Sequence, residues 1–548
     1  MIRAALGLWL AQAALCAAQP ENWIPARWEG GPLEAARRAG DGGVTSQWYD
    51  PATLALLDGT PVNCLLLTFS AGADPQIDKR QQQLVKEYAR RAHERGIAVL
   101  GLVYPGADAA AAAMAAGDAQ LDGIVLEGEF PGGLAFAQRL EKILRGTGSA
   151  AVVIPIAPSP LLRRSSWPVT AVEGVSPGVG KADDSAAAGP TGGVWLDSNM
   201  WLERSFHAGA GRTVWISHRP RPGAPGIYAR SIADAAAAGG HWIVTLDDDL
   251  RSGLLRREAG ALAQWREIAS HLAFFESRPE WRRFTPFGKV GIVLDGAESE
   301  EYLNLVARRQ IPYRVIDRAE LSAATLAGLR AALAFDLAPA TPGERNILRA
   351  FAAQGGLVLT GPSWGGAPRD QSYTIMAEGE GEIAVYKDKS PDPQSVGRDL
   401  NDLVPTPDLG VSVFNSPSVL SYVSTSGAEL LIQLVNYATA PAGPVTVWVT
   451  GQLNSARLYV PNGVPVDLPL KHSGGRTEFI VPRLAACGVV LCARSDVAQA
   501  FLPVLHSAAS PQAFRGQLSA MSFRFVTNSP VGHRGRPSAS RKFRRFNG

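Results

Sequence analysis

Between about residues 43 and 275, short apolar runs alternate with amphipathic segments of helical spacing. The runs lack a clean period of two, as expected for strands that are buried on both faces. Five of them come first, over residues 44–49, 62–69, 97–104, 122–129 and 151–156. Apolar spacing predicts helices over 82–95 and 134–145, each stopped by a glycine, Gly96 or Gly146. Regular repetition of strand and helix predicts a parallel sheet.

The later part of this region offers more strands than a closed barrel needs. Residues 170–175, 193–197, 213–218 and 242–246 are four candidates for the three strands that would complete eight. One of the first two is expected to be an insertion, because residues 176–192 are rich in Gly, Pro, Ala and Ser. A helix over 254–275 would end the unit. The sequence thus predicts a TIM-like (β/α)8 barrel over residues 19–278.

The run at 122–129 ends in two carboxylates. Alternation along a strand places Val125, Glu127 and Glu129 on one face. The two acids would be separated by roughly 6.6 Å along the strand, so each disfavours ionisation of the other. Active sites of β/α barrels lie at the carboxyl ends of the strands, where such a pair needs solvent or a partner. The pair is therefore either a functional site or two solvated loop acids.

Other polar and aromatic residues share this position at strand ends. They are Trp48, Tyr49, Asp50, Tyr104, Glu173, Trp195, Asp197, Asn199, His218, Arg219 and Asp247. Glu129 and Glu127, with Asp197 or Asp247 as partner, are the candidate catalytic acids, and the remainder are candidate substrate-binding residues. Each has a structural alternative. Asp249 could cap a helix whose positive end its neighbours Asp247 and Asp248 favour, and Trp195, Trp215 and Trp242 could belong to the core.

The stretch Asp-Gly-Ile-Val-Leu-Glu-Gly-Glu at 122–129 resembles the fourth-strand signature of chitinase-type glycoside hydrolase barrels, Asp-Gly-x-Asp-x-Asp-x-Glu. Glu129 stands in the place of that family's acid, whereas Val125 replaces the inner aspartate and Glu127 the outer one. The resemblance implies a barrel in which Glu129 protonates the leaving glycosidic oxygen. Glycoside hydrolysis in general also uses a second carboxylate, as nucleophile or as the base that activates water.

A second unit is predicted after a linker at 278–286. Residues 290–294, 313–316, 331–335 and 357–360 are strand-like, and 342–353 is helical. This flavodoxin-like α/β unit, over 286–405, resembles the amidotransferase-like domain of some β-galactosidases, where it is a non-catalytic assembly module. The resemblance implies a homo-oligomer formed through this domain. The chain has no cysteine between Cys64 and Cys487 to serve as an amidotransferase nucleophile.

The last ordered unit is predicted to be a small β-sandwich over 410–495. Its strands, at 429–436, 445–450, 456–460, 477–481 and 488–492, are separated by Gly, Pro and Asn turns. Cys487 and Cys492 could form a disulfide or remain buried thiols. Residues 496–548 are predicted to form a disordered basic tail, and the alternative is a basic tail that docks on a partner.

Residues 1–18 have the order of a secretory signal peptide: Arg3, an apolar stretch, then Ala17 and Ala18. The stretch is too short for a membrane span, so a secreted or periplasmic protein is expected. A net charge of +3 gives little support to nucleic-acid binding. No cofactor is predicted, because no Cys and His spacing suggests zinc and the run at Asp247 and Asp249 lacks the spacing of a calcium loop.

Two functions remain open at this point. The first is a secreted glycoside hydrolase that acts on an oligo- or polysaccharide. The second is a glycosidase-like barrel that binds carbohydrate or serves as a scaffold without turnover, which Val125 at a normally acidic position favours.

Overall fold

The computed structural model describes residues 19–38, 42–158, 162, 167–182, 185–186, 195–206, 212–296, 299–335 and 339–495. The described residues up to 495 belong to one compact unit. The predicted signal peptide at 1–18 and the predicted basic tail at 496–548 lie outside the described residues.

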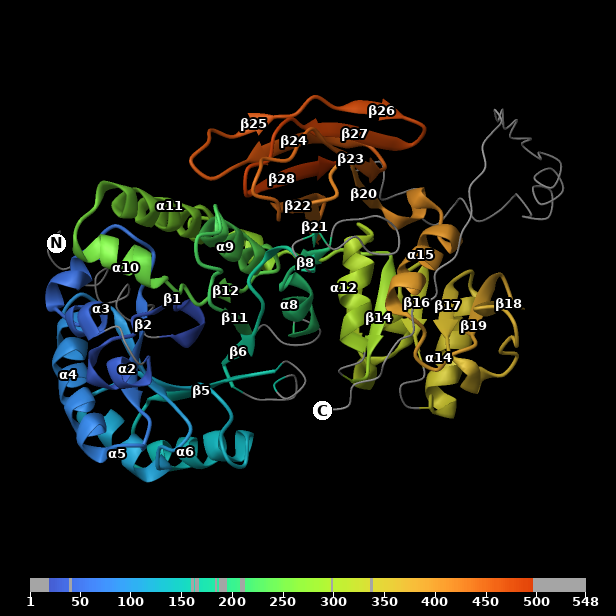
Figure 1. Ribbon diagram of the computed structural model, residues 1–548. Coiled ribbons are helices and arrows are strands. Elements are labelled where there is room, and N and C mark those ends of the chain that lie inside the picture. The colour runs from blue at the N-terminus through green and yellow to red at the C-terminus, as the bar shows by residue number, and fades with distance from the viewer. Residues whose placement is uncertain are drawn as a thin grey trace, which may run out of the picture. The chain divides into compact units, whose positions relative to one another are not determined.

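Eight parallel strands form a closed barrel (Figure 1). Each strand pairs with the next in the order β1 (Pro25–Arg27), β2 (Cys64–Ser70), β3 (Ala98–Val103), β4 (Gly123–Leu126), β5 (Val152–Ala157), β6 (Val169–Glu173), β11 (Thr213–Ser217) and β12 (His241–Trp242). A parallel bridge between Ala26 and Val244 joins the last strand to the first. The predicted barrel is thereby confirmed.

The first strand is not the predicted one. Residues 44–49 do not form a strand, because α3 (Gly42–Gln47) follows α2 (Gly31–Arg37) in this region. Val44 and Trp48 are four residues apart, which is helical spacing, and the Trp48 amide donates to the Val44 carbonyl at 3.0 Å. The true first strand has only three residues, one of them a buried arginine, so it offers no apolar run to detect.

Helices surround the barrel at its outer face (Figure 1). They include α4 (Pro75–His93), α5 (Ala109–Asp118), α6 (Leu134–Gly146), α8 (Met200–Phe206), α9 (Ile227–Ala237), α10 (Asp248–Leu255) and α11 (Ala259–Glu276). Helix α4 starts seven residues before the prediction, since the Asp74 carboxylate caps it and Pro75 fits its first turn. The predicted helix at 254–275 is two helices, separated where Arg257 has φ +57°.

Of the candidate strand at 193–197, the described residues 195–197 belong to the expected insertion. Within them, β10 (Leu196–Asp197) pairs antiparallel with β7 (Gly178–Val179), away from the barrel sheet. Residues 169–173 are the barrel strand, as β6.

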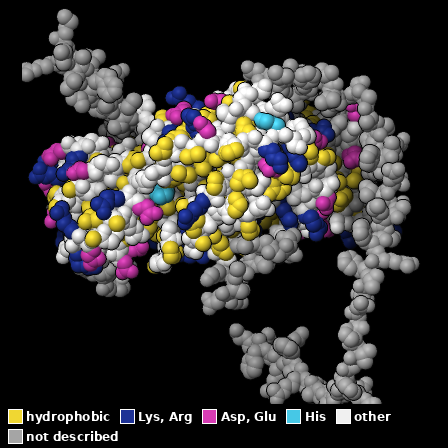
Figure 2. All heavy atoms as spheres, turned by 90° about the horizontal axis from the view of Figure 1, so that it is seen from above, with side chains coloured by type: hydrophobic (Ala, Val, Ile, Leu, Met, Phe, Trp, Pro, Cys, Tyr) yellow, Lys and Arg dark blue, Asp and Glu magenta, His cyan; other side chains and the backbone are white. Residues whose placement is uncertain are grey.

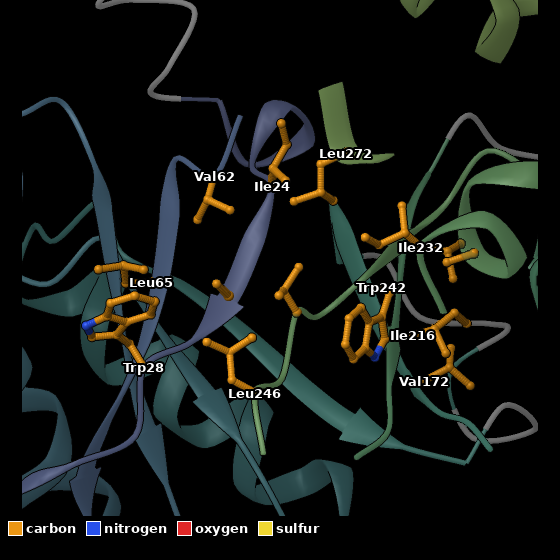
Figure 3. Close-up of a cluster of buried hydrophobic side chains, with 14 of the residues drawn as sticks. Ile24, Trp28, Val62, Leu65, Val172, Ile216, Ile232, Trp242, Leu246 and Leu272 are labelled. Atoms are coloured by element: carbon orange, nitrogen blue, oxygen red, sulfur yellow. The ribbon is translucent and has the colours of Figure 1, made fainter. Parts of the chain in front are cut away.

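The barrel strands separate two apolar layers. One layer holds Leu66, Leu100, Leu102, Val125, Ile154, Trp215 and Ile243 inside the barrel. The other packs the outer faces of the strands on the helices, through residues such as Leu65, Val172 and Ile216 (Figure 3). Ile124 and Leu126 belong to this outer layer, whereas Val125 belongs to the inner one. The predicted division of faces along β4 is confirmed.

The second unit has a six-stranded sheet in the order β15 (Tyr313–Asp317), β14 (Val290–Leu294), β16 (Ala331–Ala334), β17 (Leu357–Thr360), β19 (Gly381–Tyr386) and β18 (Tyr373–Glu378). All pairs are parallel except β18 with β19. Helices α12 (Glu300–Arg308) and α15 (Pro393–Leu403) pack on one face, and α14 (Pro342–Ala353) packs on the other (Figure 1). The flavodoxin-like prediction is confirmed, although β18 and β19 were not foreseen.

Two antiparallel sheets form the β-sandwich. One contains β13 (Thr285–Pro286), β21 (Val419–Ser426), β22 (Glu429–Asn436), β28 (Cys487–Arg494), β24 (Leu453–Tyr459) and β25 (Val466–Asp467). The other contains β20 (Val411–Phe414), β23 (Val445–Thr450), β27 (Arg476–Val481) and β26 (Lys471–Ser473). Cys487 and Cys492 are buried free thiols on β28. Five residues of strand separate them by roughly 16 Å, which excludes a disulfide between them.

Basic and acidic side chains are interspersed among hydrophobic ones on the face drawn in Figure 2. Within the described parts of the chain, no helix combines the length and apolar character needed to cross a lipid bilayer.

Glu203 on α8 should make the stability of the fold depend on pH. Its side chain is completely buried, and burial, followed by the charge of Asp234, raises its pKa well above the usual glutamate range. The folded state therefore keeps the proton that the unfolded state releases above about pH 4.3, so stability is fully present below that pH and is lost as pH rises toward the folded pKa. Over this window, Glu203 is expected to lower the free energy of unfolding by about 1.4 kcal/mol per pH unit.

Glu203→Gln should remove this slope, which urea unfolding at about pH 5 and about pH 8 would measure. Glu267→Gln, at an exposed site on α11, is the control and should leave the slope unchanged. A slope that is equal in wild type and Glu203→Gln would contradict the prediction.

Candidate active site

The inward-facing positions become polar at the carboxyl ends of the barrel strands. Residues two apart on a strand face the same side, so Glu127 follows Val125 on the inner face of the barrel, Tyr104 follows Leu102 and Ser217 follows Trp215. Some members of the polar layer lie on the strands themselves: Arg27 on β1, Ser70 on β2, Glu173 on β6 and Ser217 on β11. The others follow directly after a strand: Glu29 after β1, Tyr104 after β3, Glu127 and Glu129 after β4, Arg219 after β11 and Thr245 after β12. The end of the barrel where active sites form is therefore lined with charged groups.

Arg27 lies at the centre of this layer. Its buried guanidinium donates to the carboxylate of Glu127 at 2.6 Å, to that of Glu29 at 3.2 Å and to the Ser217 hydroxyl at 2.8 Å. Burial opposes the charge on Arg27, but the carboxylates of Glu127 and Glu29 outweigh it and raise the pKa of Arg27 above its usual value. One cation thereby connects strands β1, β4 and β11.

Glu29 is a buried anion with several cationic partners. Besides Arg27, it accepts from Arg38 at 2.9 Å and from Arg219 at 2.8 Å. Burial alone would raise the pKa of Glu29, but Arg219 and then Arg27 lower it to about 2. Glu29 is consequently ionised at every pH of physiological interest.

Three glutamates gather at the ends of β4 and β6. The Glu127 side chain is 25% exposed, whereas Glu129 and Glu173 are exposed. Although the Glu173 side chain as a whole is exposed, its carboxyl is partly desolvated by the surrounding protein, and this desolvation, followed by the charges of Glu129 and Glu127, raises the pKa of Glu173. The structure thus brings together three acids that the sequence placed at strand ends.

Tyr104 lies at the mouth, whereas His218, predicted as a substrate-binding residue, packs on the outer side of the barrel. The Tyr104 hydroxyl is buried and has no hydrogen-bond partner among the described residues, and the Arg37 guanidinium lies 3.1 Å from the centre of its ring. Burial raises the pKa of Tyr104 well above its usual value. His218 stacks on Trp242, with ring centres 5.3 Å apart, and burial lowers its pKa to about 4, so the ring is neutral at pH 7.

Three predicted site residues lie away from the mouth, because the first strand was misplaced. Trp48 and Tyr49 are core residues, with 1% and 3% exposure, and Trp48 packs on Trp28 at 4.7 Å between ring centres. Asp50 caps the short helix η2 (Pro51–Leu57) by accepting from the Ala52 amide. None of the three is placed to contact a ligand in the barrel.

The predicted residues of the insertion have structural partners. Arg308 stacks on Trp195 at 3.7 Å, and Asp197 accepts from Arg221 at 2.9 Å. Asn199 is buried and its side-chain amide donates to the Val175 carbonyl and to Asp234. These contacts hold the insertion in place and do not bring Asp197 to the three glutamates.

Asp247 is the cap of α10. It accepts from the Leu250 amide at 2.8 Å and from the Tyr228 hydroxyl at 2.6 Å, so the cap is Asp247 rather than Asp249, which lies in the first turn of the helix. Trp215 lies inside the barrel and Trp242 on its outer side, both buried, which is the structural alternative.

A cavity of about 640 Å³ opens beside the mouth. It is lined by Glu34, Arg37, Arg38, Arg219, Pro220, Pro222, Thr245, Leu246, Asp247, Asp248 and Asp249. These residues come from α2, from the loop after β11 and from the start of α10. None of the three glutamates lines it.

Sequence reasoning missed Arg27, Glu29, Glu34, Arg37 and Arg38. Their signal was the polar alternation of Arg27 and Glu29 around buried Trp28, which is weak in so short a strand. Among the described residues, no group of three or more His, Cys, Asp and Glu side chains is arranged to hold a metal ion.

No protein-family model matches the sequence, and no curated protein matches it. Solved structures with similar folds include a GH42 β-galactosidase from G. stearothermophilus, determined as a catalytic mutant, at 10% identity and a TM-score of 0.54 over 87% of this chain and 99% of that chain. A cold-adapted β-galactosidase from Rahnella sp. R3 is similar at 10% identity and a TM-score of 0.51, over 86% and 99% of the two chains. At this identity the likeness concerns the fold, a barrel followed by further α/β and β units.

Proposed function

We propose that this protein is a glycoside hydrolase whose catalytic carboxyls come from Glu127, Glu129 and Glu173. The observation that carries the proposal is the gathering of these acids at the carboxyl ends of β4 and β6, where desolvation, followed by the charges of Glu129 and Glu127, raises the pKa of Glu173. Glycoside hydrolysis needs one carboxyl that holds a proton and one that is ionised. The fold, which is also found in two β-galactosidases, is compatible with this reaction.

Glu127 suits the role of the second carboxylate. The Arg27 guanidinium lies 2.6 Å from its carboxylate and donates a hydrogen bond to it, which fixes its orientation at the mouth. An ionised, oriented carboxylate can attack the anomeric carbon or activate a water molecule.

Glu173 suits the proton-donor role. Its raised pKa keeps a larger fraction protonated near neutral pH, as a general acid requires. The assignment of the acid to Glu129, suggested by the strand signature, stays a hypothesis. In the arrangement proposed here, Glu129 supplies the negative charge that helps Glu173 to keep its proton.

A screen for hydrolysis tests the proposal. The full chain is incubated with nitrophenyl glycosides of common sugars, β-galactosides first, and with oligosaccharides. Release of nitrophenol that disappears in Glu127→Gln is expected. If the wild-type chain cleaves none of these substrates, whereas a parallel preparation of a known glycosidase cleaves them, the proposal is wrong.

A barrel that binds sugar without cleaving it is the second candidate. It is favoured by the position of the cavity, whose lining includes none of the three glutamates. Saturable binding of an oligosaccharide that is recovered intact after prolonged incubation would support this function over the first.

We also propose that the chain is exported and that it associates through its flavodoxin-like unit. Export rests on the order of charge, apolar stretch and small residues at 1–18. Association rests on the resemblance of this unit to an assembly module.

A further inference from the structure

The cavity beside the mouth carries charges of both signs. Three arginines and four carboxylates line it, with Arg37 and Arg219 on the walls formed by α2 and the loop after β11, and Asp248 and Asp249 at the start of α10. Whether such a site prefers an anion, a cation or a neutral ligand depends on which of these groups are already used by the protein.

Two arginines keep free donors. Arg37 contacts Glu34 only at 3.6 Å, beyond hydrogen-bond distance, and its side chain is 37% exposed. Arg219 gives one N–H to Glu29, its side chain is 50% exposed, and its other N–H groups have no hydrogen-bond partner within the described ranges. Arg38, in contrast, is fully engaged with Glu29, Glu34 and Asp248.

Two aspartates keep free acceptors. Asp249 is exposed and has no hydrogen-bond or ion-pair partner in the part of the chain that the structure describes. One oxygen of Asp248 accepts from Arg38 and Arg251, whereas the other has no partner there. Asp247 is used on both oxygens and Glu34 is buried, so neither adds a free acceptor.

The remaining lining is apolar. Pro220, Pro222 and Leu246 contribute apolar surface to the same cavity. A pyranose ring has the matching character, since its hydroxyls both donate and accept at the edge while its C–H groups form an apolar face. A volume of about 640 Å³ lies within the range of small-molecule sites.

We propose that this cavity binds a neutral sugar unit, with Arg37 and Arg219 donating to its hydroxyls and Asp248 and Asp249 accepting from them. The inference names the substrate class for the proposed function and rests on it for biological meaning. An acidic sugar is disfavoured, because its carboxylate or sulfate would face the free aspartates as well as the arginines. An amino sugar is disfavoured by Arg37 and Arg219 for the converse reason.

Binding of monosaccharides to the full chain tests the inference without requiring turnover. The panel contains galactose, glucose, mannose and xylose as neutral sugars, galacturonate and glucuronate as acidic sugars, and glucosamine as a basic one. Dissociation constants are measured by ligand-observed NMR. At least one neutral sugar is expected to bind about tenfold more tightly than its acidic or basic counterpart.

Two variants locate the binding. Arg219→Met and Asp249→Ala should each weaken the neutral sugar by about tenfold, the effect of losing one charge-assisted hydrogen bond. Arg221→Met is the matched control, because Arg221 lies in the same loop with 54% side-chain exposure but pairs with Asp197 outside the cavity lining. It should leave the affinity unchanged, and circular dichroism should show that all three variants are folded.

The inference is overturned if no neutral sugar in the panel binds, if an acidic or basic sugar binds as tightly, or if Arg219→Met and Asp249→Ala retain wild-type affinity. Failure here is distinguishable from failure of the proposed function. A chain that hydrolyses glycosides but shows wild-type binding in both variants would lose only the cavity assignment. A chain that binds neutral sugars through Arg219 and Asp249 but cleaves nothing would lose only the hydrolase assignment.

Discussion

Replacing Glu173 by Gln is expected to lower kcat/KM by about 10²-fold or more on a substrate with a poor leaving group, because the variant cannot deliver a proton to the departing oxygen. On a dinitrophenyl glycoside, whose leaving group needs no proton, the loss should be much smaller. Glu127→Gln should instead slow both substrates, since an attacking or water-activating carboxylate is needed for each. Initial rates on the two substrates provide the comparison.

Glu129→Gln separates this assignment from the one suggested by the strand signature. If Glu129 only supports Glu173, the variant removes a negative charge that raises the pKa of Glu173. The pKa of the acid then falls, so the alkaline limb of the pH–rate profile should shift to lower pH, with little dependence on the leaving group. A dependence on the leaving group that appears in Glu129→Gln and is missing in Glu173→Gln would assign the acid to Glu129 instead.

Arg27→Met is expected to destabilise the barrel by about 3 kcal/mol, the scale on which removing one partner of a buried ion pair acts. Methionine preserves much of the volume, so the change reports the lost charge and the lost hydrogen bonds to Glu127, Glu29 and Ser217. Urea unfolding followed by tryptophan fluorescence measures it.

The double variant Arg27→Met with Glu127→Gln should recover part of this loss, because the carboxylate that lost its partner no longer carries a charge. Arg145→Met, which breaks a pair with Glu141 on the surface of α6, serves as control and should change the unfolding midpoint little. Equal effects of Arg27→Met and Arg145→Met would show that Arg27 does not hold the mouth together.

Much of the barrel could be predicted because its buried strands are long enough to form apolar runs. The run ending in Glu127 and Glu129 also gave the correct inward face, since alternation is fixed by strand geometry. The first strand could not be found in this way. It has three residues, and the last of them, Arg27, is a charged residue at the centre of the mouth. Arg27 can be buried there because it pairs with the carboxylates of Glu127, which follows β4, and Glu29, which follows β1.

The sequence predicted which polar residues lie at the ends of strands, but not which of them lie close together in the folded barrel. Glu173 was recognised as a strand-end acid, but its closeness to Glu129 follows from the closed barrel rather than from any local pattern. Trp48 and Trp195 show the reverse. Both are aromatic residues near expected strand ends, yet neither lies at the mouth. Trp48 packs on Trp28 in the core, and Trp195 stacks on Arg308 of the flavodoxin-like unit, and no local sequence pattern predicts either contact.

The closure of the barrel has a consequence for any ligand in the cavity. The two shortest barrel strands, β1 and β12, are neighbours, and an isolated parallel bridge at Ala26 and Val244 joins the chain at this seam. The cavity lies over this seam, since α2 follows β1 and α10 follows β12. A sugar held between Arg37 and Asp249 would therefore contact both the first and the last βα repeat. Its binding would stabilise the closed barrel, and opening of the barrel at this seam would in turn weaken binding of the sugar.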